Sequence, residues 1–182
     1  KKLKIHMDGA RLFNAATALN TNVSNLTKYL DTVTFCLSKG LSCPVGSIIC
    51  GSKDTILEAK RWRKAIGGGM RQAGVFAAAG IVALNNMVDR LAEDHENAKK
   101  IGNGLADIDG IEIDVDYIKT NIIRFSLKDK SFDMNKFKNG LLDNGVMISP
   151  SGGTVRMVTH REISHDDVGL VIRAVSKSIQ EL

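Results

Sequence analysis

Proline, cysteine and aromatic residues are all scarce in this sequence, and it contains no long apolar run. Two prolines in 182 residues leave no room for a Pro-rich repeat. No apolar stretch approaches the ~20 residues of a membrane span, and no signal-peptide pattern is present. The three cysteines (Cys36, Cys43 and Cys50) are odd in number and lack the spacing of metal ligands. We therefore expect a cytoplasmic protein with reduced thiols, no metal site and no membrane contact.

The sequence also lacks an initiator methionine and begins almost directly with an apolar strand at Leu3. This start is typical of the later part of a longer protein. The hydrophobic content of 43% and the charged content of 25% are ordinary for a globular chain that can bury a core.

The net charge of +5 is concentrated in the basic segment 60–64, which contains Trp62. Basic segments with an aromatic residue occur in proteins that bind nucleic acid. However, Ile56, Leu57, Ala59 and Trp62 can give the predicted helix 54–66 a buried face. We therefore favour a solvated helix face, or a basic wall for an anionic ligand, over nucleic acid.

Hydrophobic periodicity predicts an α/β chain of two domains, with a boundary between residues 103 and 104. Strands are expected near 3–7, 32–37 and 46–50, helices near 10–18 and 53–65, and a long helix from about 71 to 105. This order predicts a mainly parallel sheet in a large domain, 1–103. Strands near 111–115, 121–127 and 154–158, with helices near 133–143 and 165–180, predict a small α+β domain, 104–182, with an antiparallel sheet. Ser164 and Asp167 resemble a capping box.

Polar residues that could take part in catalysis follow two of the predicted strands. Lys39 follows the strand 32–37, and Asp8 ends the strand near 3–7. Ligands bind at the carboxyl ends of strands in open α/β sheets, and a lysine held there can attack a carbonyl to form a Schiff base. A solvated lysine at a strand end and a turn-forming aspartate are the structural alternatives.

Three further motifs carry basic residues. Arg11 and Arg156 can bind a carboxylate through two parallel hydrogen bonds, and Arg156 lies within an apolar strand. Gly67–Gly69 with Arg71, near Lys64, can cradle a phosphate at the start of the following helix, or can be a hinge. Among the histidines, only His160 shares the strand parity of Arg156, so it alone is a candidate for the same pocket.

Together these motifs resemble the low-specificity threonine aldolases, which are fold type I enzymes that use pyridoxal 5'-phosphate. The motifs are His6 to Arg11, Phe35 to Leu41 with Pro44 to Ser47, Arg61 to Lys64, Gly67 to Gln72, and Arg156 to His160. The resemblance covers essentially the whole chain.

The resemblance implies a role for each candidate residue. Lys39 is the Schiff-base lysine and Asp8 the partner of the pyridine nitrogen. Arg11 and Arg156 bind the carboxylate of an amino acid substrate, and Arg11 also contacts the cofactor. The resemblance also implies that Lys64 and Arg71 lie near the cofactor phosphate, from a neighbouring subunit of a homotetramer. The family's earlier half, with its ring-stacking histidine, is expected to precede Lys1, and the segment alone is expected to be inactive.

Other functions remain open at this point. An aminotransferase or a β-eliminating lyase of the same fold would use the same Lys39 and Asp8. A non-catalytic module that binds anions or nucleic acid through residues 60–64 and Arg71 is another alternative, as is a segment that only supports the folding of a partner.

Overall fold

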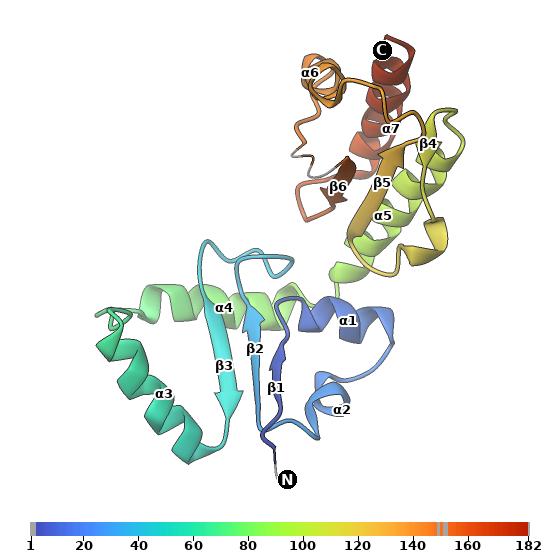
Figure 1. Ribbon diagram of the computed structural model, residues 1–182. Coiled ribbons are helices and arrows are strands. Elements are labelled where there is room, and N and C mark those ends of the chain that lie inside the picture. Colours follow the sequence, from blue (N-terminus) through green and yellow to red (C-terminus); the bar gives the residue numbers. More distant parts are fainter. Residues whose placement is uncertain (1–2, 149, 151–152, 182) are drawn as a thin grey trace. The chain divides into compact units, whose positions relative to one another are not determined.

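The computed structural model describes residues 3–148, 150 and 153–181 (Figure 1). The chain forms two compact units, the first ending at Leu91 and the second beginning at Ala92. Each unit has its own sheet, its own helices and its own hydrophobic core.

The first unit contains a mixed sheet of three strands in the order β1-β2-β3. Its elements are β1 (His6–Asp8), α1 (Leu12–Ala18), α2 (Val23–Thr27), β2 (Thr32–Cys36), β3 (Ser47–Gly51), α3 (Lys53–Ala65) and α4 (Gly74–Asn86). Strands β1 and β2 are parallel, as predicted, whereas β3 runs antiparallel to β2. The connection 37–46 contains no helix and is too short for a parallel crossover. The prediction of a mainly parallel sheet thus holds for β1 and β2 and not for β3.

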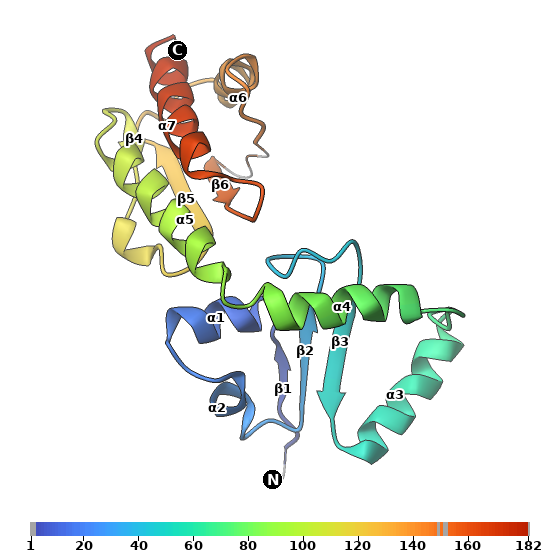
Figure 2. The same cartoon turned by 180° about the vertical axis from the view of Figure 1, so that it is seen from behind.

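Alternate residues of β2 anchor this sheet to the helices. Val33 and Phe35 are buried with Leu12 of α1 and Ala83 of α4. The rings of Phe13 and Phe35 meet edge to face, with centroids 5.2 Å apart. Figures 1 and 2 show α4 running across one face of the sheet. The alternation along β2 therefore fixes which face the helices cover.

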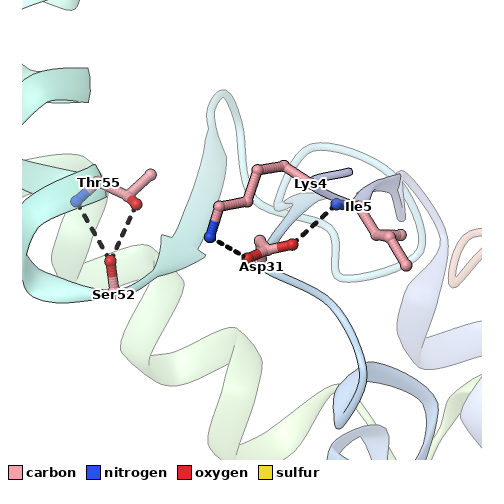
Figure 3. Close-up of polar contacts among 5 residues, drawn as sticks. All are labelled: Lys4, Ile5, Asp31, Ser52 and Thr55. Carbon is pink, nitrogen blue, oxygen red and sulfur yellow. Dashed lines mark hydrogen bonds and ion pairs between the residues drawn. The ribbon is translucent and has the colours of Figure 1, made fainter. Parts of the chain in front are cut away.

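Asp31, which lies just before β2, holds the segment before β1 against the start of β2 by hydrogen bonds. Its carboxylate accepts hydrogen bonds from Lys4 Nζ at 2.7 Å and from the backbone N–H of Ile5 at 2.8 Å (Figure 3). These bonds lower the pKa of Asp31 below its usual value, with the Lys4 hydrogen bond as the largest cause. In the same view Ser52 caps α3 by accepting from the N–H of Thr55 at 3.3 Å.

Several elements of the first unit expose apolar side chains. Every residue of β3 is exposed, and α3 has no buried residue. The expectation that α3 buries a face through Leu57 and Trp62 is wrong, because these side chains are 52% and 63% exposed. On α4, Val75, Ile81 and Val82 are more than half exposed. Within the described chain nothing covers these surfaces, so the amphipathic pattern of α3 has no partner there.

The predicted helix from 71 to 105 is two helices, α4 and α5 (Leu91–Ala106). The last hydrogen bond of α4 runs from Met87 N to Ala83 O, and Leu91 N then bonds to Val88 O in a tighter turn. Asn85 and Asn86 at the end of α4 and Asp89 in the connection have side chains that compete for backbone groups and weaken a helix. The two units divide just after this break, twelve residues before the boundary that the sequence predicts.

The second unit consists of an antiparallel sheet covered by helices. After α5 come β4 (Ile111–Glu112), the 3-10 turn η1 (Val115–Tyr117), β5 (Ile122–Leu127), α6 (Met134–Asp143), β6 (Thr154–Val158) and α7 (His165–Gln180). The strand order is β4-β5-β6, and both pairs are antiparallel, as predicted. Figure 2 shows α5 and α7 side by side on one face of this sheet. Ser164 and Asp167 form the predicted capping box.

Buried polar residues fix the entry to the β5–β6 pair. Asn121 Nδ2 donates to the carbonyl of Thr159 at 2.8 Å, and Thr159 Oγ1 donates to the carbonyl of Asp94 at 2.6 Å. Both Asn121 and Thr159 are almost fully buried. These hydrogen bonds favour one register, because a slip would break them in the core, where Asn121 Oδ1 already has no hydrogen-bond partner among the described residues.

No single helix of the described residues is long and apolar enough to cross a membrane, and only α4 and α5 taken together across their break meet both criteria. Among the same residues, no group of three or more His, Cys, Asp or Glu side chains is placed to hold a metal ion.

Candidate active site

The parallel pairing of β1 and β2 brings Asp8 and the loop of Lys39 to one edge of the first sheet. Asp8, the last residue of β1, is the Cα partner of Thr34, and β2 ends two residues later at Cys36. The next residue, Gly9, donates its N–H to the carbonyl of Thr34 at 2.8 Å. The carboxyl ends of both strands therefore lie at the same edge, as the sequence predicts.

Lys39 lies on a well-anchored loop and projects an exposed side chain. Leu37 N bonds to Gly46 O at 2.9 Å, Cys43 N to Leu37 O at 3.0 Å, and Ser42 N to Lys39 O at 2.8 Å. Leu37, Leu41 and Cys43 are buried in the core. Burial also raises the pKa of the Cys43 thiol, which keeps it protonated. The loop backbone is thus held while the amine stays accessible.

The residue after Lys39 must be small. A Cβ on Gly40 would lie 2.8 Å from Cδ2 of Leu91 and 3.1 Å from Oδ1 of Asn14 on α1. Gly40 is buried, so this close approach fixes the distance between the loop and α1. Asn14, whose side chain is almost fully buried, therefore helps to place Lys39, although the sequence alone did not single it out.

Asp8 and Arg11 lie on the turn that joins β1 to α1. Asp8 is exposed, and its Oδ1 accepts from the N–H of Ala10 at 3.2 Å. Arg11 is half-buried and occupies the N-cap position of α1. The turn-forming role considered for Asp8 is thus real, and it holds the carboxylate at the sheet edge.

The glycine segment differs from the prediction. Gly67 N and Gly68 N bond back to Lys64 O and Arg63 O, and Gly67 has a φ of +91°. These glycines therefore end α3, whereas α4 begins only at Gly74, beyond an exposed Arg71. The segment is a hinge between two helices, as the alternative interpretation held, and not the start of the second.

Two basic residues of this segment remain candidates for an anion. The side chain of Lys64 packs directly on Gly69, where a Cβ would collide with its Cδ. No hydrogen bond or ion pair among the described residues joins Lys64 or Arg71 to Asp8 or Lys39. Their proximity to the cofactor stays a prediction.

Arg156 lies on β6 of the second unit and is exposed. Its Cα partner is Arg124 on β5, a residue that the sequence analysis did not single out. The alternation of apolar and polar residues along 121–127 indicates that Arg124 lies on the exposed face of the strand. Only the strand register places it opposite Arg156. His160 does not share the parity of Arg156, because β6 ends at Val158 and His160 Nδ1 accepts from Glu162 N at 3.3 Å in a turn.

Sequence comparison identifies the family. A family model described as beta-eliminating lyase matches residues 1–128. The chain belongs to this family. It is 44% identical over 168 residues to low-specificity L-threonine aldolase 1 of Arabidopsis thaliana, covering 91% of this chain and 47% of that protein. It is 41% identical over 175 residues to the low specificity L-threonine aldolase of Escherichia coli K12, covering 94% and 50%. The resemblance to threonine aldolases predicted from the motifs is confirmed.

Solved structures agree on the fold of this beta-eliminating lyase family member. A putative L-allo-threonine aldolase of Listeria monocytogenes superposes with a TM-score of 0.79 at 20% identity, covering 97% of this chain and 52% of that one. A Sphingomonas wittichii serine palmitoyltransferase gives 0.66 at 20% identity, covering 87% and 42%. The predicted fold class, that of the fold type I enzymes, is confirmed. The chain spans about half the length of the curated relatives it matches.

Proposed function

We propose that the protein containing this chain is a pyridoxal phosphate-dependent aldolase that cleaves β-hydroxy-α-amino acids, such as threonine, into glycine and an aldehyde. The observation that carries this proposal is the convergence of Lys39 and Asp8 at one sheet edge. It occurs in a chain that is 41–44% identical to low-specificity threonine aldolases.

The residues at this edge fit the cofactor. An aldehyde requires an accessible amine, and Lys39 is exposed on a loop whose backbone is held by hydrogen bonds on both sides. A protonated pyridine ring requires a carboxylate, and Asp8 is exposed on the neighbouring strand. When bound, pyridoxal phosphate supplies an electron sink for the negative charge left on the substrate Cα.

The chain's own residues then divide the work. Lys39 Nζ holds the cofactor aldehyde, and the Asp8 carboxylate keeps a proton on the pyridine nitrogen. Arg11 and Arg156 bind and orient the substrate carboxylate through paired hydrogen bonds, which a planar guanidinium can make. Lys64 and Arg71 contribute positive charge for the cofactor phosphate.

We also propose that the active protein is a cytoplasmic homo-oligomer, a dimer of dimers. The exposed apolar side chains of β3, α3 and α4 support this proposal, since single-chain proteins rarely leave large apolar patches uncovered. The remainder of the protein and a second subunit are the partners that we expect to cover them.

Product analysis tests the function. The full-length protein is incubated with threonine and pyridoxal phosphate, with a Lys39→Ala variant as the control. We expect glycine and acetaldehyde in equal amounts from the wild type and neither from the variant. The family model favours one rival, a β-eliminating lyase, which would release ammonia and 2-oxobutanoate from threonine. That product pair, or a keto acid formed with transfer of the amino group, would overturn the proposal.

A further inference from the structure

Two arginines face each other across the second sheet. Arg124 on β5 is the direct Cα partner of Arg156 on β6, and both are exposed. Residues opposite each other on neighbouring strands project to the same face, with Cβ atoms about 5 Å apart. Like charges in this arrangement destabilise a sheet. A pair of this kind therefore requires a reason other than folding.

No counter-ion for the pair is found in the part of the chain that the structure describes. Neither arginine takes part there in a hydrogen bond or an ion pair. The adjoining pairs on this face, Ile122 with Val158 and Ser126 with Thr154, are uncharged. The acid of the neighbouring strand, Glu112, instead accepts a hydrogen bond from Ser126 Oγ at 3.2 Å. Neither guanidinium is therefore bonded to a carboxylate in the described part of the chain.

The strands hold the two arginines rigidly. On the opposite face, Ile123, Phe125 and Val155 alternate with them and are 2% exposed or less. These residues pack into the main core of the second unit. Because the inward side chains are locked, the register that sets Arg124 beside Arg156 cannot slip without exposing the core. The backbone positions of the two arginines are therefore fixed side by side.

Arg124 also lines a cavity, whose lining does not include Arg156. Its volume is about 310 Å³, and its lining includes Arg124, Lys119, Asp114, Tyr117 and Thr120. This size lies at the lower end of the range for small-molecule sites. Lys119 adds a further positive charge to this lining. Asp114 offsets part of this charge, so the cavity beside Arg124 carries one acidic and two basic side chains.

We propose that Arg124 and Arg156 form one site for a small dianion with two separated carboxylates. Each arginine binds one of the two carboxylates. A single carboxylate neutralises the charge of only one guanidinium, whereas a dicarboxylate can accept paired hydrogen bonds from both guanidinium groups. This inference rests on the proposed aldolase function, in which Arg124 is a residue that determines substrate specificity. It favours β-hydroxy-α-amino acids that carry a second carboxylate, such as 3-hydroxyaspartate, over threonine.

Binding measurements on the full-length protein test the site without any turnover. Calorimetric titrations compare succinate, butyrate and inorganic phosphate on the wild type and on Arg124→Gln. A charge-assisted bidentate pair contributes enough for us to expect succinate affinity to fall roughly ten-fold in the variant. Butyrate affinity should change less than about two-fold, since it needs one arginine only. Arg124→Lys keeps the positive charge but cannot make two parallel hydrogen bonds. Its succinate affinity should lie between those of the wild type and Arg124→Gln.

The matched control is Arg173→Gln on α7, which removes one exposed positive charge from the same unit outside the exposed face of the sheet. It should leave succinate affinity unchanged. Equal losses for succinate and butyrate in Arg124→Gln, or a wild type without preference for succinate, would overturn the proposal. Phosphate bound more tightly than succinate would overturn it too, because it would identify a compact anion.

The two proposals fail in different ways. If succinate binding depends on Arg124 in a protein that does not cleave threonine, the aldolase function fails and the site stands. If the protein cleaves threonine, and Arg124→Gln leaves the ratio of kcat/KM for 3-hydroxyaspartate to that for threonine within two-fold, the site fails and the aldolase stands.

Discussion

Asp8 lies beside Thr34 on the neighbouring parallel strand, and the N–H that follows Asp8 donates to the Thr34 carbonyl at 2.8 Å. This bond extends the pairing of β1 and β2 by one residue beyond the last residue of β1. It holds the carboxylate of Asp8 at the edge where β2 passes into the loop of Lys39. The candidate active site therefore depends on this close approach of the backbone after β1 to β2.

Gly9→Ala should disrupt that approach. A Cβ at position 9 would lie 2.7 Å from the carbonyl oxygen of Thr34, and a backbone atom cannot rotate away. Overpacking of this kind costs about 1–3 kcal/mol of unfolding free energy. Urea titration of the full-length protein should show that loss. Gly74→Ala is the control, because its Cβ would meet nothing within 4 Å at the first position of α4. A Gly9→Ala midpoint equal to wild type would show that the strands relax freely.

Borohydride reduction in the presence of pyridoxal phosphate should attach the cofactor permanently to Lys39. The reason is the exposed amine on a held loop at the sheet edge where β1 ends with the Asp8 carboxylate. Peptide mapping by mass spectrometry locates the label. Lys53 and Lys64 are the internal comparisons, since both belong to α3 of the same unit. A label on either of them in place of Lys39 would remove Lys39 from its proposed role.

Arg156→Lys should weaken substrate binding far more than cofactor binding. A lysine keeps the charge but cannot form two parallel hydrogen bonds with a carboxylate. Loss of a charge-assisted bidentate pair costs on the order of 1.5–3 kcal/mol, or roughly ten- to a hundred-fold in kcat/KM. Steady-state kinetics with threonine measures this loss, and absorbance titration checks that the cofactor still binds. Kinetics unchanged within about two-fold would exclude Arg156 from the carboxylate site.

Asp31→Asn should reduce stability in a pH-dependent manner. The pKa of Asp31 is lowered in the folded state, first by the Lys4 hydrogen bond and then by the Ile5 N–H. A lowered pKa stabilises the fold above the usual value of 3.8, and this contribution disappears as the pH falls through the folded pKa.

The measurement for Asp31 is the urea midpoint of wild type and variant at several pH values. The difference between them should be largest near neutral pH and should shrink below about pH 4. The matched control is Asp107→Asn, at an exposed acid directly after α5. Its difference in urea midpoint from wild type should not change with pH in this way. A difference that is constant down to pH 2 would contradict the role of the carboxylate charge.

Local patterns predicted most of the elements well. The helices predicted over 53–65 and 165–180 have those bounds, and the strand predicted over 32–37 is β2, Thr32–Cys36. Each has a periodicity and a start signal within its own residues, such as the cap at Ser52 or the capping box at Ser164. The prediction failed for the helix from 71 to 105, where the helix-weakening residues Asn85, Asn86 and Asp89 interrupt an otherwise favourable stretch.

The sequence by itself determined the family, the strand-end positions of Lys39 and Asp8, and the elements that carry them, because motifs and periodicity are local properties. Only the tertiary structure decided which of those positions meet. Strand pairing sets Asp8 beside Thr34 and Arg124 opposite Arg156, and neither partner can be read from spacing. Register arises from hydrogen bonds and core packing between residues far apart in the chain, so it exists only once the sheet has formed.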